Sequence, residues 1–260
     1  KLIFIDTLAA VLAGCIIMGC YVENENFYTN QNKSTDWGNS IRGVIMFLTC
    51  LLDACIIVHY LKRLSIYKLK KEKSEEETLR STGLLKTMIA ELILCSLVCP
   101  PKFDYTFSGR MLSGTYTYSW NAIICVIGLC KFYLIIRLYG HYSRWTGEEA
   151  STIGRKFNVT PNSIFALKAD LKYRPYTMLF IWMCTSVFIL GFAIRTFEMP
   201  FSVDEEAEAE GAIAKTSTDF GHLSNAMWMT IITMTTVGYG DAYPSTHLGR
   251  AIAVVACLFG

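Results

Sequence analysis

Five residues near the C-terminal end, Thr236 to Gly240, constrain this chain more than any other stretch. They read Thr-Val-Gly-Tyr-Gly and lie between an apolar segment at 222–235 and Pro244. Glycine adopts left-handed backbone dihedrals without a steric penalty, so Gly238 and Gly240 allow successive carbonyls to point the same way. Stacked rings of such carbonyls replace the hydration shell of K⁺ when four copies of the sequence meet around one axis. The motif therefore predicts a potassium-selectivity filter in a homotetramer.

The surrounding sequence supports this interpretation over a strand and turn that spell the motif by chance. The segment 222–235 is too short to span a bilayer but long enough for a re-entrant pore helix. Irregular backbone at membrane depth must be buried in protein or line an aqueous path, and a filter meets that condition. The predicted filter residues are Thr236, Val237, Gly238, Tyr239 and Gly240, with K⁺ held at Thr236, Val237, Gly238 and Tyr239. Filter support is predicted from Thr235, Asp241 and Trp228.

Apolar segments dominate the rest of the chain. The sequence is 52% hydrophobic and 18% charged, with a mean hydropathy of +0.34, which favours an integral membrane protein over a soluble domain. Runs long enough to cross a bilayer lie at about 2–22, 41–61, 84–100, 119–139, 175–197 and from 247 onward. We therefore expect an all-α membrane protein with six transmembrane helices. The re-entrant pore helix and filter would lie between the fifth and sixth, in a tetrameric cation-channel architecture.

The order of these runs predicts three domains. They are a four-helix voltage-sensor-like domain at 1–139, cytoplasmic linker helices at 140–174 and a pore domain at 175–260. Lys1 leads directly into an apolar run, and the last run stops about fourteen residues in. We therefore expect this sequence to be part of a longer protein, with the gate and any C-terminal regulatory domain outside it.

Basic residues predict the orientation in the membrane. The loop at 62–83 carries seven lysines and arginines, the linker at 140–174 carries six, and the loop at 23–40 carries only Lys33. Basic loops stay in the cytoplasm, so the N-terminus is expected on the cytoplasmic side of the membrane. The protein itself is expected in the plasma membrane. Asn32 is a glycosylation acceptor on the predicted outer side.

The fourth apolar run is a poor voltage sensor. A sensor needs about three or four charges per subunit, because each contributes only about 2.3 kcal/mol per 100 mV. Here the run offers Lys131 and Arg137, so we expect weak voltage dependence. The acids inside the first three runs are expected to be static counter-charges for these two cations: Asp6, Asp53 and Glu91.

Neither the cysteines nor the histidines indicate an enzyme. All ten cysteines lie in apolar segments, which predicts reduced thiols that pack as small hydrophobes. The four histidines are scattered and show no nucleophile-base pairing. His59 and His141, near the ends of predicted spans, are expected to lie at the membrane interface. We expect no catalytic residues and no nucleic-acid partner.

From the fourth run onward the sequence resembles the small- and intermediate-conductance calcium-activated potassium channels. Ala226-Met-Trp228 is similar to the A-M-W of that family, and 193–198 is similar to its T-V-R-x-C-E. The long linker at 142–174 also resembles the linker of the family. The filter departs from the pattern: the family usually reads S-I-G-Y-G-D, whereas 235–241 reads as in voltage-gated potassium channels.

The resemblance implies opening by intracellular calcium through bound calmodulin, which contacts the helical linker. The chain has no D-x-[DN]-x-[DN]-G loop of its own, so calcium would be sensed by the partner. The stretch 163–172 is amphipathic, and Leu167 and Leu171 are the candidate calmodulin contacts. A helix that lies along the inner leaflet explains the same pattern.

Three alternatives stay open at this point. The first is a voltage-gated potassium channel with a degenerate sensor. The second is a secondary transporter, but paired interruptions in two related halves are not found. The third is a non-conducting structural membrane protein, which would not need the Thr-Val-Gly-Tyr-Gly motif.

Overall fold

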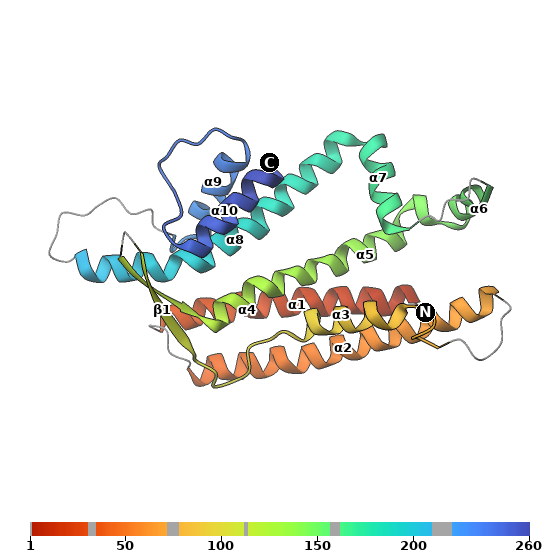
Figure 1. Cartoon of the computed structure of the whole chain (residues 1–260), viewed down its shortest axis with the longest axis horizontal. Helices are drawn as coiled ribbons and strands as arrows, with labels where there is room; N and C mark the ends of the chain where they lie inside the picture. The colour runs from red at the N-terminus through yellow and green to blue at the C-terminus, as the bar shows by residue number, and fades with distance from the viewer. Residues whose placement is uncertain (1, 31–34, 72–77, 112–113, 157–161, 210–219) are drawn as a thin grey trace. The chain divides into compact units, whose positions relative to one another are not determined.

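The computed structural model describes residues 2–30, 35–71, 78–111, 114–156, 162–209 and 220–260 (Figure 1). Asn32 lies outside these ranges. The helices are α1 (Leu2–Thr29), α2 (Asp36–Lys71), α3 (Leu84–Ser96), α4 (Trp120–Gly128), η1 (Leu129–Phe132), α5 (Tyr133–Tyr142), η2 (Arg144–Thr146), α6 (Glu148–Lys156), α7 (Ser163–Tyr173), α8 (Pro175–Ala209), α9 (Leu223–Met234) and α10 (His247–Phe259). The strands are β1 (Thr106–Met111) and β2 (Gly114–Ser119).

The chain divides into two compact units. Unit 1 contains residues 1–27, 34–103 and 127–173, and unit 2 contains residues 28–33, 104–126 and 174–260. Residues 104–126, which are most of the segment between α3 and η1, therefore group with the C-terminal unit. The three predicted domains stay a prediction.

Small residues on α1 let neighbouring helices pack closely in unit 1. Ala9 and Ala13 of α1 share a buried core with Leu52 and Ile56 of α2, Cys95 of α3 and Leu134 of α5. Close packing of these aliphatic side chains stabilises the bundle through van der Waals contacts, because lipid tails are as apolar as the side chains themselves. The bundle thus fixes the parts of α1, α2 and α5 on which the polar side chains described below are carried.

Four described helices are long and apolar enough to cross a membrane. They lie at Leu2–Phe27, Asp36–Leu69, Trp120–Tyr142 and Pro175–Met199. Two of the six predicted spans form shorter helices, α3 and α10, each of 13 residues. Pro100 and Pro101 follow α3 and prevent its continuation, since proline clashes with a preceding helical turn.

A β-hairpin between α3 and α4 corrects the all-α expectation. Strands β1 and β2 pair antiparallel, from Thr106 opposite Ser119 to Met111 opposite Gly114. The alternation of Thr and Tyr in β2 is the period-two pattern of a strand. The sequence interpretation passed over it because the segment lies beside an apolar run.

The hairpin packs on the helices of unit 2. The Tyr118 ring meets Phe197 of α8 edge-on, with ring centroids 6.0 Å apart. The Tyr118 hydroxyl accepts a hydrogen bond from the Leu248 N–H at 3.3 Å, in the first turn of α10. First-turn amides have no partner within their own helix, so the hairpin satisfies one of them.

Helices α9 and α10 both pack against α8 (Figure 1). Ile194 of α8 shares a buried cluster with Ala226 and Met229 of α9, and Val187 shares another with Met234 and Ala256. Helix α9 covers 12 residues and ends where the Thr-Val-Gly-Tyr-Gly segment begins. The three helices therefore hold this segment at both ends.

Candidate functional site

The backbone of the Thr-Val-Gly-Tyr-Gly segment alternates between ordinary and left-handed conformations. The φ angles are 59° at Thr236, 58° at Gly238 and 76° at Gly240. Elsewhere among the described residues, φ is positive only at Gly83 and Lys102. An alternation of this kind turns successive peptide groups so that their carbonyls can face one side, as coordination of a dehydrated cation requires.

The end of α9 holds the start of this segment. The Ile232 carbonyl accepts hydrogen bonds from Val237 N at 3.0 Å and from Gly238 N at 3.1 Å. The Thr236 amide donates to the Thr233 carbonyl at 3.1 Å. The amides therefore bond back toward the helix, which leaves the carbonyls of the segment available for other partners.

Trp228 and Asp241 support the C-terminal part of the segment. The Trp228 Nε1–H donates to Asp241 Oδ2 at 2.9 Å, and the Trp228 ring stacks on Tyr239 with centroids 5.9 Å apart and an angle of 9°. Thr235 bonds within its own helix, because its hydroxyl donates to the Ile231 carbonyl at 2.7 Å. The structure thus brings Trp228 and Asp241 together at the segment, whereas the Thr235 hydroxyl caps α9.

A buried carboxylate that the sequence interpretation missed holds the start of α10. Glu198 is 1% exposed and accepts from Ser245 N at 2.8 Å, Thr246 N at 2.9 Å and the Thr246 hydroxyl at 2.7 Å. Thr246 is the N-cap of α10 and accepts from Gly249 N at 3.0 Å. A negative charge is favoured beside the N-terminus of a helix.

A buried guanidinium holds the chain just before the start of α9, as Glu198 holds the start of α10. Arg195 of α8 donates to the Gly221 carbonyl through Nε at 3.1 Å and through Nη2 at 2.6 Å. Residue 221 immediately precedes the N-cap of α9. Arg195 and Glu198, one turn apart on α8, thus position the two helices that flank the Thr-Val-Gly-Tyr-Gly segment. Their spacing in 193–198 is the signal that could have identified them.

The charges of the fourth predicted span lie in unit 1. Lys131, in η1, is 1% exposed and donates to the Leu97 carbonyl at 3.1 Å. Asp53 of α2 interacts electrostatically with Lys131, but no hydrogen bond joins them in the described part of the chain. Lys131 therefore bonds to a main-chain carbonyl, and the role of Asp53 as its counter-charge stays a prediction.

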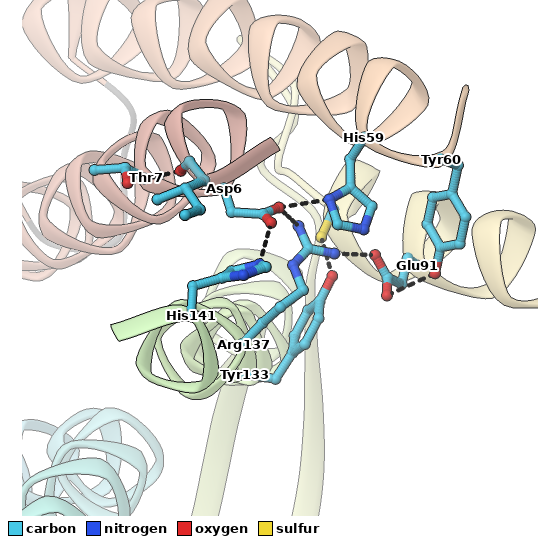
Figure 2. A network of polar contacts seen from close by, with 10 residues as sticks. Asp6, Thr7, His59, Tyr60, Glu91, Tyr133, Arg137 and His141 are labelled. Carbon is cyan, nitrogen blue, oxygen red and sulfur yellow. Dashed lines mark hydrogen bonds and ion pairs between the residues drawn. The ribbon is translucent and has the colours of Figure 1, made fainter. Parts of the chain in front are cut away.

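Arg137 takes part in a network that joins four helices (Figure 2). Its Nη1 donates to Glu91 Oε2 at 2.9 Å, and its Nη2 lies 3.3 Å from Asp6 Oδ1. The Tyr60 hydroxyl donates to the second oxygen of Glu91 at 2.9 Å. Arg137 therefore contacts two of the three acids that the sequence places in the first three spans.

Two histidines that were expected at the membrane interface belong to the same network. His59 Nδ1 lies 2.6 Å from Asp6 Oδ1, and His141 Nε2 lies 2.6 Å from Asp6 Oδ2. His59 lies within α2 and His141 near the end of α5, helices that are distant in the sequence. No spacing within the sequence could have paired them with Asp6.

The linker after α5 is held by a second group of contacts in unit 1. Asp170 of α7 accepts from Trp145 Nε1 at 2.8 Å and from the Tyr139 hydroxyl. The Arg144 guanidinium lies 4.8 Å from the ring centroid of Trp145 and 4.3 Å from that of Tyr173. These contacts fix α7 to the end of α5.

One face of α7 stays uncovered. Ala166 is buried, whereas Ile164 is 63% exposed, Leu167 37% and Leu171 46%. These three residues recur at the spacing of one helical face. The structure thus presents Leu167 and Leu171 on an exposed apolar face of a helix whose N-terminus is capped by Asn162, which accepts from Phe165 N at 2.9 Å.

Comparisons with known proteins agree with this geometry. Residues 177–260 match the ion-channel family. The chain is 23% identical over 258 residues to the small conductance calcium-activated potassium channel protein of Drosophila melanogaster, a match that covers 95% of this chain and 26% of that protein. It is also 36% identical over 89 residues to the voltage-gated potassium channel regulatory subunit KCNG3 of Mus musculus, which covers 34% of this chain and 18% of that protein.

These matches bear on two of the predictions. They confirm the resemblance to calcium-activated potassium channels, and they place the chain with channels rather than with an enzyme family. Together with the four long apolar helices, they indicate a helical membrane protein. The chain spans about a quarter of the length of the Drosophila relative.

Proposed function

Residues 177–260 match the ion-channel family, and on this ground we propose that the chain is a subunit of a potassium-selective channel. The observation that carries the proposal is the alternation of left-handed residues at Thr236, Gly238 and Gly240 within Thr-Val-Gly-Tyr-Gly. Backbone carbonyls of 236–239 would bind K⁺ in place of water. Trp228 and Asp241 would hold the outer end of the filter.

The same proposal includes the arrangement in the membrane. One subunit supplies one carbonyl at each level, so four identical subunits are needed to surround the ion. Helix α9 would be the re-entrant pore helix, and α3 and α10 would complete six spans. The basic loop after α2 and the linker 140–174 would face the cytoplasm of a cell with this channel in its plasma membrane.

Current reversal in the full-length protein tests potassium selectivity. With K⁺ inside and Na⁺ outside, the reversal potential is expected to follow the K⁺ gradient. Gly238→Ala is expected to abolish the current, because a Cβ is disfavoured at a φ of 58°. Gly43→Ala is the matched control, since a Cβ at this glycine of α2 meets nothing within 4 Å. A reversal potential that follows Na⁺, or wild-type current in Gly238→Ala, contradicts the proposal.

We further propose that intracellular calcium opens the channel through bound calmodulin. The exposed apolar face of α7 supports this, because calmodulin binds amphipathic helices through such faces. Fixing α7 to α5 through Asp170 would let a partner that binds α7 act on the rest of unit 1. The similarity to the Drosophila channel supports the same stimulus.

Polar substitution of the α7 face tests calcium gating. Leu167→Gln with Leu171→Gln is expected to abolish calcium activation in inside-out patches and to leave the reversal potential unchanged. The control is Ile153→Gln, a still more exposed apolar residue of α6. Calcium activation that survives the double substitution would remove α7 as the docking site.

The filter sequence and the similarity to KCNG3 favour a second candidate, a voltage-gated channel with a degenerate sensor. Arg137 argues against steep gating, because two carboxylates hold its guanidinium. Voltage steps at zero and at saturating calcium separate the candidates. Steep opening at zero calcium would favour the voltage-gated channel.

A further inference from the structure

Asp6 is a single carboxylate that two imidazoles approach from different helices (Figure 2). His59 of α2 reaches one of its oxygens and His141 of α5 reaches the other, each at 2.6 Å. The Asp6 and His59 side chains are almost fully buried, whereas the side chain of His141 is 27% exposed. The carboxylate is therefore a point where α1, α2 and α5 are joined, and His141 is the member that solvent can reach.

The charges of this group do not balance when both imidazoles are neutral. Asp6 and Glu91 share the guanidinium of Arg137, so one negative charge is left uncompensated. An uncompensated charge is costly inside a membrane domain. Imidazole is the side chain that gains a proton between pH 5 and 8, and one proton at Asp6 would neutralise the group.

The other titratable groups around this network leave that balance unchanged. Phenols and thiols are uncharged near neutral pH. The phenols and thiols that face the network are Tyr60 from α2, Cys95 from α3, and Tyr133 and Tyr142 from α5, beside Glu91 and Arg137, whose charges are already counted. Farther along the bundle, the charges of Asp53 and Lys131 oppose each other.

The guanidinium also argues against a metal ion at this place. Arg137 Nη2 lies 3.3 Å from the same Asp6 oxygen that His59 approaches. A second cation would have to displace it. Within the described ranges, no group of three acidic, histidine or cysteine side chains is arranged to hold a metal.

We propose that Asp6, His59 and His141 form a proton-binding site that makes channel opening depend on pH. The inference rests on the proposed function and its orientation, which place this end of unit 1 at the cytoplasm. Solvent protons reach the group through His141, its exposed member. The added charge strengthens the pair of His141 with Asp6 and clamps the end of α5 to α1.

The position of His141 connects this clamp to gating. Helix α5 ends at Tyr142, directly after His141, and continues into the linker that carries α7. A clamped α5 fixes the starting point of the linker. Acidification of the cytoplasm therefore reduces opening at a given calcium concentration.

Inside-out patches with the full-length channel at saturating calcium test the proposal. Lowering the cytoplasmic pH from 8 to 6 is expected to reduce the current about fivefold, the change that one modest hydrogen bond produces in an equilibrium. His141→Gln is expected to lose this pH dependence, and His141→Lys to stay at the acid level at every pH. His222→Gln, in unit 2, is the matched control and should respond like the wild type.

Two results would overturn the proposal: equal pH dependence in wild type and His141→Gln, or full current in His141→Lys at all pH values. A second readout does not need conduction. The melting temperature of purified wild type is expected to gain about 2–4 °C over His141→Gln between pH 8 and 6. A constant difference would overturn the proton site, whereas absent K⁺ current in wild type would contradict the proposed function instead.

Discussion

Two buried groups of charges, one in each unit of this chain, are held in different ways. In unit 2, Glu198 and Arg195 bond mainly to main-chain groups, the amides at Ser245 and Thr246 and the carbonyl of Gly221. In unit 1, Arg137 bonds to the carboxylates of Asp6 and Glu91, which also contact histidines and a tyrosine. Main-chain partners cannot change their charge, whereas side-chain partners can.

This difference separates a fixed scaffold from an adjustable one. The proposed filter would need its flanking helices in one position at any pH, and amide and carbonyl partners provide that. The network of unit 1 consists of ionisable side chains, so a change in their charge would change its strength. Three substitutions test the comparison.

Glu198→Ala should have the largest effect. It removes the acceptor of two buried amides and one hydroxyl, and we expect a loss of about 3–5 kcal/mol in folding free energy, because each unsatisfied buried donor costs about 1–3 kcal/mol. The melting temperature of the purified full-length protein and its K⁺ current density measure this. Glu198→Gln keeps one acceptor and should lose about half as much. An Ala variant as stable as wild type would show that the carboxylate does not hold α10.

Arg137→Gln should have an intermediate effect. It leaves Asp6 and Glu91 facing each other without a guanidinium, and we expect a loss of about 2–3 kcal/mol, below the range for a fully buried pair because the Arg137 side chain is 16% exposed. Thermal unfolding at pH 8 measures the loss.

A double-mutant cycle shows whether unpaired charge causes the loss of stability in Arg137→Gln. Adding Glu91→Gln to Arg137→Gln should recover about 1–2 kcal/mol, because it removes one of the two unpaired carboxylates. Strictly additive losses would mean that Arg137 stabilises unit 1 through packing, and the contrast between the units would weaken.

Tyr118→Phe should have the smallest effect. It removes only the acceptor for Leu248 N and keeps the ring on Phe197, so we expect a loss of about 0.5–1 kcal/mol. Tyr118→Ala removes the ring as well and should cost several times more. If both variants unfold at the wild-type temperature, the hairpin does not contribute to the stability of unit 2.

Local sequence signals predicted a large part of the structure. The filter glycines required left-handed backbone, and Gly238 and Gly240 have it. Apolar runs located α1, α2, α8 and the α4–α5 segment, because a helix that faces lipid is apolar on all sides. The family resemblance followed from short motifs around Trp228 and Arg195.

Contacts between distant segments could not be predicted in the same way. His59 and His141 meet Asp6 because three helices pack together, and the chain separates His141 from Asp6 by 135 positions. Glu198 binds Thr246 across 48 positions. Patterns in a single sequence describe one helix or strand at a time, so they do not predict contacts between residues that are far apart in the chain.

Thr236 gives the filter a property that its glycines do not. A residue with a Cβ at a φ of 59° stores roughly 1–3 kcal/mol of backbone strain. In the proposed tetramer this strain recurs in every subunit, so the filter is a metastable element. It keeps its shape only while the Ile232 carbonyl and the Trp228–Asp241 bond restrain its two ends. If either restraint were lost, the carbonyls would turn away from the ion, and conduction would stop at the proposed filter with every helix still in place.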